Sequence, residues 1–171
     1  MTSAAWLGHG LQAYVIPEMK VIGWICGATG ILFLQIGSIQ LIKSNLTNSI
    51  KKGITTWVVI QYFVAVCSMI YFLRIGIVEA FKVTQVNSVI GLIGVVLPLH
   101  IVSVIKLKKK SSKIVIAALV YSAIPGLVYS NQISISCWFN YHDISHVLMS
   151  IFMTVMFFGL FRLVNGTNQA E

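Results

Sequence analysis

Long apolar segments recur along the whole chain and are separated by short polar stretches. A helix needs about 20 consecutive apolar residues to cross the hydrocarbon core of a bilayer, with a working range of about 17–25. Five segments reach this length, namely 21–42, 54–73, 83–105, 114–132 and 142–164. A sixth, 2–16, ends at Pro17 and would reach only about 24 Å as a helix. The pattern predicts an all-α fold, a polytopic membrane bundle of about six transmembrane helices in a single domain, 1–171.

The amino-acid composition also indicates that most of the chain is surrounded by lipid rather than water. The 171 residues are 57% hydrophobic and only 9% charged, whereas soluble domains carry about 25% charged residues. The net charge of +8 does not indicate nucleic-acid binding, because most basic residues fall in short loops between apolar segments, as topology-setting charges do. We therefore expect no nucleic-acid partner and an integral membrane location.

The basic residues also predict an orientation. With six spans, nine lie on the side that holds the N-terminus and three on the opposite side. The nine are Lys43, Lys51, Lys52, Lys106, Lys108, Lys109, Lys110, Lys113 and Arg162, and the three are Lys20, Arg74 and Lys82. Because basic loops stay in the cytoplasm, both termini are expected to be cytoplasmic.

The densest group of ionisable residues is His142, Asp143 and His146, at the start of the last apolar segment. Two histidines four apart lie about 40° from each other on one helix face and can reach the same ion. This spacing is common in metal sites, and zinc suits neutral imidazole. The alternative is a polar helix start, in which Asn140 caps the helix and Asp143 interacts with its dipole.

A zinc site needs a third ligand, and His9 is the best candidate. In the six-helix topology His9, His142 and His146 lie at similar depth, near the exoplasmic or lumenal side. Carboxylates near that side, Asp143 and Glu18, are the candidate catalytic groups, as a general base or as a partner that orients a ligand histidine. His100 lies toward the opposite side and is expected to be a packing or interfacial histidine.

Residues 140–148 (NYHDISHVL) resemble the last-helix motif of the superfamily that joins the alkaline ceramidases and the progestin and adipoQ receptors. The resemblance implies a zinc-dependent seven-helix lipid amidase, with His9 as the third ligand. The six helices would match the second to seventh of that superfamily, making the chain a divergent member without the first helix. Two positions depart from its pattern: Ala5 replaces a serine, and Glu18 and Lys20 lie near the place of an aspartate.

The leading hypothesis is a zinc-dependent membrane hydrolase that acts on an amide or ester bond of a membrane lipid. The alternative is a non-enzymatic lipid-binding or receptor-like membrane protein that retains the metal site. Haem ligation by His9 and His146 and a transporter role also stay open.

Overall fold

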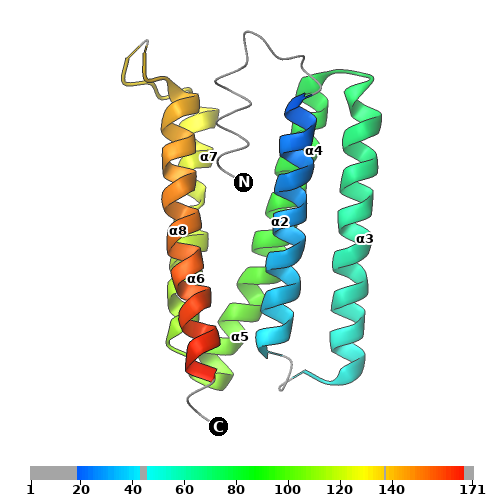
Figure 1. Cartoon of the computed structure of the whole chain (residues 1–171), viewed down its shortest axis with the longest axis vertical. Helices are drawn as coiled ribbons and strands as arrows, with labels where there is room; N and C mark the ends of the chain where they lie inside the picture. Colours follow the sequence, from blue (N-terminus) through cyan, green and yellow to red (C-terminus); the bar gives the residue numbers. More distant parts are fainter. Residues whose placement is uncertain (1–18, 43–45, 137, 168–171) are drawn as a thin grey trace. The chain divides into compact units, whose positions relative to one another are not determined.

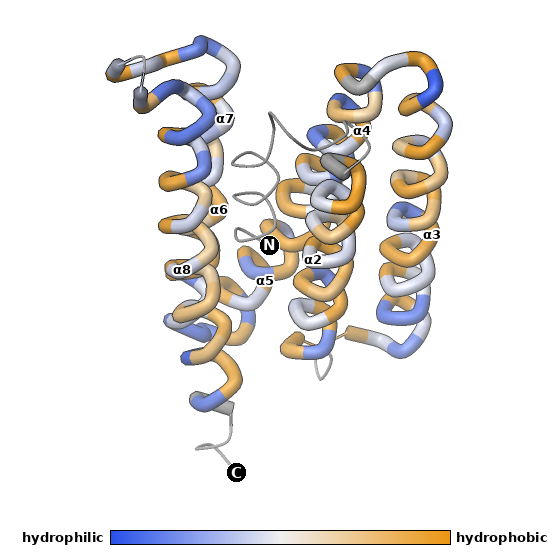
Figure 2. Tube along the Cα trace, turned by 45° about the horizontal axis from the view of Figure 1, so that its top comes forward, coloured by the Kyte–Doolittle hydropathy of each residue, from blue (hydrophilic) through white to orange (hydrophobic). Residues whose placement is uncertain are grey.

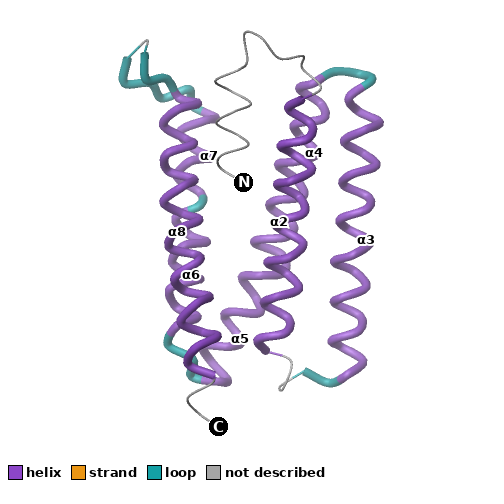
Figure 3. The backbone as a smooth tube through the Cα atoms, viewed as in Figure 1, coloured by secondary structure: helices purple, strands orange, loops and turns teal. Residues whose placement is uncertain are grey.

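The computed structural model describes residues 19–42, 46–136 and 138–167, and every regular element among them is a helix (Figures 1 and 3). The elements are α2 (Met19–Ile42), α3 (Asn48–Leu73), α4 (Ile77–Val89), the π-helix η2 (Ile90–Val96), α5 (Leu97–Leu107), α6 (Ser111–Tyr121), α7 (Ala123–Ser130) and α8 (Tyr141–Thr167). Elements α4, η2 and α5 follow one another without a loop, and a single residue separates α6 from α7.

Five of these helical runs are long and apolar enough to cross a membrane, which confirms the predicted all-α membrane bundle. They are Val21–Ile42, Asn48–Leu73, Val78–Leu107, Ser111–Ser130 and Tyr141–Asn165. The sixth predicted segment, 2–16, lies outside the described residues.

The structure extends α3 six residues before the predicted start at Ile54. The helix begins after Thr47, whose side-chain oxygen accepts a hydrogen bond from the Ile50 N–H at 3.4 Å. Hydropathy marks only the part of a helix that lies in hydrocarbon, whereas capping marks where the helix itself begins. Lys51 and Lys52 therefore belong to the first turn and a half of α3 rather than to a loop.

Many large apolar side chains on these helices point outward. Phe33, Phe63 and Phe157 are 68%, 60% and 62% exposed, and no more than 33% of any candidate span is buried within the described chain. Figure 2 shows hydrophobic residues along the middle of the helices and hydrophilic residues at their ends. Apolar surface on this scale needs a lipid environment.

The described residues divide into two compact units, one ending at Leu99 and one beginning at His100. In the N-terminal unit, α2, α3, α4 and η2 pack together. Ala28 of α2 lies against Ala65 and Met69 of α3 in a small buried cluster. Small residues at such contacts let helix backbones approach closely, which replaces the hydrophobic driving force that is missing in lipid.

Three buried amides link α2, α3 and α4 in this unit. The Gln35 Nε2 donates to Gln61 Oε1 at 3.1 Å, and the Gln61 Nε2 donates to Asn87 Oδ1 at 3.0 Å and to the Asn87 carbonyl at 3.2 Å. All three residues are buried. Since no water reaches polar groups in a bilayer core, each amide satisfies the next, and the network ties three helices together.

The π-helix η2 precedes Pro98, one of two prolines for which we expect helix distortion. Proline lacks an N–H and its ring clashes with the carbonyl four residues earlier, so the α-helical pattern cannot continue unchanged. In η2 the backbone adopts longer turns, and the Leu97 N–H bonds to the Leu92 carbonyl, five residues back. At Pro125 the second distortion appears as the break between α6 and α7 at Ser122.

Gly91, in η2, sits where that helix crosses α2. A Cβ built on Gly91 would overlap Ile31 Cγ2 and lie 3.3 Å from Gln35 Nε2. Around Gly23 and Gly27 of α2, in contrast, no described atom lies within 4 Å of such a Cβ. The close approach that glycine permits is therefore needed at Gly91.

In the C-terminal unit, α8 packs along α6 and α7. Its buried residues, Phe152, Met156 and Leu163, recur at helical spacing and form the packed face of α8. Gly159 lies on the same face, where an added Cβ would come within 2.9 Å of Val115 Cγ2 and 3.2 Å of the Val115 backbone nitrogen.

Candidate functional site

The candidate site lies at the start of α8, which two reciprocal hydrogen bonds hold in place. The Asn140 side-chain oxygen accepts from the His142 N–H at 2.8 Å, and Asp143 Oδ2 accepts from the Asn140 N–H at 3.1 Å. This is a capping box, in which two helix-terminal N–H groups are satisfied by side chains. The carboxylate of Asp143 is thus engaged in starting the helix that carries both histidines.

The loop between α7 and α8 adds to this anchoring. Two residues after the end of α7, Gln132 lies in the left-handed region (φ 53°), and the Ile133 N–H bonds back to the Val128 carbonyl at 3.1 Å. This bond pattern is a Schellman motif, which closes the end of α7. The loop then returns to α8, where Ser134 Oγ accepts from the Tyr141 N–H at 3.1 Å.

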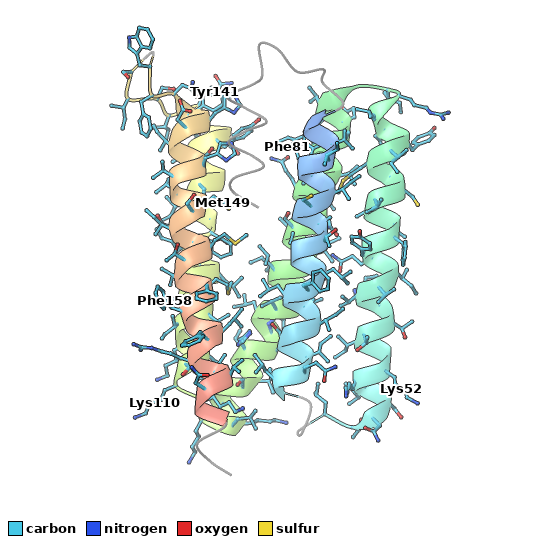
Figure 4. All side chains as sticks on the ribbon, in the orientation of Figure 1. Lys52, Phe81, Lys110, Tyr141, Met149 and Phe158 are labelled. Atoms are coloured by element: carbon cyan, nitrogen blue, oxygen red, sulfur yellow. The ribbon has the colours of Figure 1, made fainter. Side chains whose placement is uncertain are left out.

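Two tyrosines hold the His142 ring. Tyr141 lies beside it with a centroid distance of 4.2 Å, and Tyr129 of α7 meets it edge-on at 5.3 Å. Figure 4 shows Tyr141 at the end of the C-terminal unit opposite Lys110. Packing of this kind restricts the orientation of an imidazole, which a metal ligand requires.

His146 lies one turn further along α8 and is half-buried, as is His142. By helical geometry the two histidines share a face about a quarter turn from the packed face of α8. Both histidines therefore lie at the edge of the packed face, where Tyr129 of α7 contacts the His142 ring.

Two of the three predicted ligands, His142 and His146, lie among the described residues. His9 and Glu18 lie outside the described residues, and within the described part of the chain no three His, Cys, Asp or Glu side chains cluster as a metal site would. The histidine pair itself fits the chemistry of zinc, since two half-buried imidazoles lie one turn apart. Asp143 is placed at the helix cap, in line with the alternative interpretation of this segment.

A second polar group, not predicted from the sequence, is buried around His100. This side chain has no exposed surface, and its Nδ1 lies 3.3 Å from Ser112 Oγ. Ser112 donates its own proton to Ser103 Oγ at 2.9 Å, so the pair lacks the arrangement of a serine nucleophile activated by histidine. The group joins α5 to α6, which fits a packing histidine.

The helices, their outward apolar surface and their internally satisfied polar groups define an integral membrane protein of the helical-bundle class. Residues 2–165 match the model of a family described as a family of unknown function, DUF6962, and the chain belongs to that family. No curated protein and no solved structure matches the chain.

Proposed function

We propose that the protein is a zinc-dependent membrane hydrolase that acts on an amide or ester bond of a lipid. The observation that carries the proposal is the pair His142 and His146 on one face of α8, at the depth where the helix enters the membrane. His9 is the proposed third ligand. The resemblance of residues 140–148 to the alkaline ceramidase and adipoQ receptor superfamily supports the same chemistry.

The described residues around the pair would orient it rather than react. Asn140 and Asp143 fix the first turn of α8, and Tyr129 and Tyr141 hold the His142 ring. A bound zinc ion would polarise the carbonyl of the bond to be cleaved. Because Asp143 is engaged at the cap, Glu18 is the carboxylate that we propose as general base.

The purified protein is expected to hold about one zinc per chain, because three histidine ligands leave one position open, as in catalytic sites. His142→Ala with His146→Ala should remove nearly all of the metal and all release of fatty acid from a panel of N-acyl and ester lipids. Elemental analysis and the lipid assay measure the two effects, with Val147→Ala as the matched control on the same turn.

Zinc that stays at full occupancy in the double histidine variant would refute the site. Full zinc occupancy in the unaltered protein without hydrolysis of any lipid in the panel would favour the receptor-like alternative. Absorption near 400 nm in the purified protein would instead indicate haem.

The proposed site faces the exoplasm or lumen, since the basic residues cluster at the other ends of the helices. When the spans are taken to cross the membrane in alternating directions, that other side is assigned Lys51, Lys52, Lys106, Lys108, Lys109, Lys110, Lys113 and Arg162. We expect a fluorescent reporter fused after Glu171 to be active in the cytoplasm, and a tag inserted at Trp138, which is 92% exposed, to be accessible from outside. Labelling of the Trp138 tag only after the membrane is opened would reverse the orientation.

A further inference from the structure

A cleft of about 310 Å³ opens on the N-terminal unit, and neither His142 nor His146 belongs to its lining. One wall comes from the first half of α3 and the other from η2 and the start of α5. It is lined by Gly53, Ile54, Trp57, Gly94, Val95, Pro98 and Leu99. These residues offer an apolar lining in which two glycines leave space and the indole of Trp57, 55% exposed, forms a flat side.

The depth of the cleft matches the acyl region of one leaflet. Helix α3 has 26 residues, about 39 Å of helix against a hydrocarbon core of about 30 Å, so each end projects only a few ångströms beyond it. Gly53 and Trp57 lie about 8–14 Å along the helix from its first residue, Asn48. The cleft therefore begins just inside the hydrocarbon boundary.

Charge at this boundary favours an anionic group. Lys51 and Lys52 lie in α3 directly before Gly53, and Figure 4 shows Lys52 at the end of α3 away from Phe81. Among the described residues of this unit the acidic side chain is Glu79, in the first turn of α4 at the opposite end, where Lys82 pairs with it at 2.7 Å. Neither lysine at the cleft end thus has an acidic neighbour within this part of the unit.

We propose that the cleft binds an anionic phospholipid from the leaflet on the basic side. One acyl chain would lie in the cleft against Trp57 and Pro98, and the phosphate would sit near Lys51 and Lys52. Long lysine side chains reach the headgroup region from a helix end while their stems stay in apolar surroundings. An apolar cleft beside two lysines that have no acidic neighbour among the described residues of this unit is complementary to such a lipid in both polarity and charge.

The test uses Trp57 as the reporter of the lipid beside it. In full-length protein with Trp6, Trp24 and Trp138 replaced by Phe, brominated phosphatidylglycerol and brominated phosphatidylcholine in mixed vesicles are compared as quenchers of Trp57 fluorescence. We expect a preference of roughly tenfold or more for the anionic lipid, because each lysine near the surface favours it several-fold. Lys51→Gln with Lys52→Gln should remove that preference.

Gly53→Leu supplies the second arm, because it should fill the cleft. No described atom lies within 4 Å of a Cβ at Gly53, so a side chain can begin there without overlap. Gly37→Leu is the matched control, an exposed position of α2 with equally open surroundings that does not line the cleft. We expect Gly53→Leu, and not Gly37→Leu, to abolish the preference for the anionic lipid.

Equal quenching of Trp57 by the two brominated lipids would overturn the proposal, because the cleft would then contact bulk lipid without selectivity. An anionic preference that survives Gly53→Leu would also overturn it, since the lipid would then bind elsewhere. Zinc content and hydrolysis are measured separately, so neither result depends on the proposed hydrolase activity.

Discussion

Gly91→Leu is expected to lower the free energy of unfolding of the protein by about 3 kcal/mol or more, the upper range for overpacking a tight contact. A Cβ at this position already overlaps Ile31 Cγ2 and comes within 3.4 Å of Gln35 Cδ. Ile31 is β-branched and its Cγ2 is attached directly to Cβ, so it has little freedom to move aside. The helices would have to separate, which also pulls on the buried amide network through Gln35.

Gly37→Leu controls for the general effect of replacing a helical glycine. Position 37 is exposed and open, so we expect a change within about 0.5 kcal/mol. The free energy of unfolding can be measured by denaturant titration in mixed micelles, with helicity as the signal.

Gly91→Ala combined with Ile31→Ala should recover much of the stability lost in Gly91→Ala alone, because the overlapping methyl group is gone. A Gly91→Leu protein as stable as the control would show that α2 and η2 do not cross closely.

Gln61→Leu is expected to cost about 2 kcal/mol of stability, because it leaves buried amide groups of Gln35 and Asn87 without partners. The matched control is Gln85→Leu, because Gln85 is an exposed glutamine of α4, two residues before Asn87, where a leucine would face lipid. Gln85→Leu should leave the free energy of unfolding unchanged or raise it.

Removing the whole network is expected to destabilise the protein less than removing Gln61 alone. Replacing all three amides with leucine leaves no orphaned polar group, so the triple variant should be more stable than Gln61→Leu alone. Additive destabilisation by the three single changes would contradict a shared network. Both comparisons use the same micelle titration as the Gly91 variants.

The five described spans could be predicted from hydropathy because a bilayer imposes length and apolarity on each crossing segment. Which faces meet is not set by hydropathy. The glycines of α2 and η2 look alike in sequence, yet of Gly23, Gly27 and Gly91 the last is the one in close contact. The Gln35–Gln61–Asn87 network depends on three helices with long sequence separations, and no local pattern encodes it, although polar residues within apolar spans are a signal that such a site exists.

In the candidate site, too, some features could be predicted from the sequence and others depend on the fold. The spacing of His142 and His146 is a local property, so the helix places them on one face as predicted. The sequence left Asp143 open between a catalytic and a capping role, and the structure places its carboxylate on the Asn140 N–H. The contact of Tyr129 with His142 depends on how α7 ends and the loop returns, which spacing alone does not determine.

The π-helix has a consequence for evolution within the family. Each turn closed by a bond to the fifth preceding residue holds one residue more than an α-helical turn, as the Leu97 to Leu92 bond shows. An extra residue rotates everything that follows by about 100°. Relatives with a regular α-helix here would therefore need a one-residue deletion between Val89 and Leu97 to keep Asn87 and His100 on their present faces. A single gap at this point in an alignment would mark the extra residue that the π-helix accommodates.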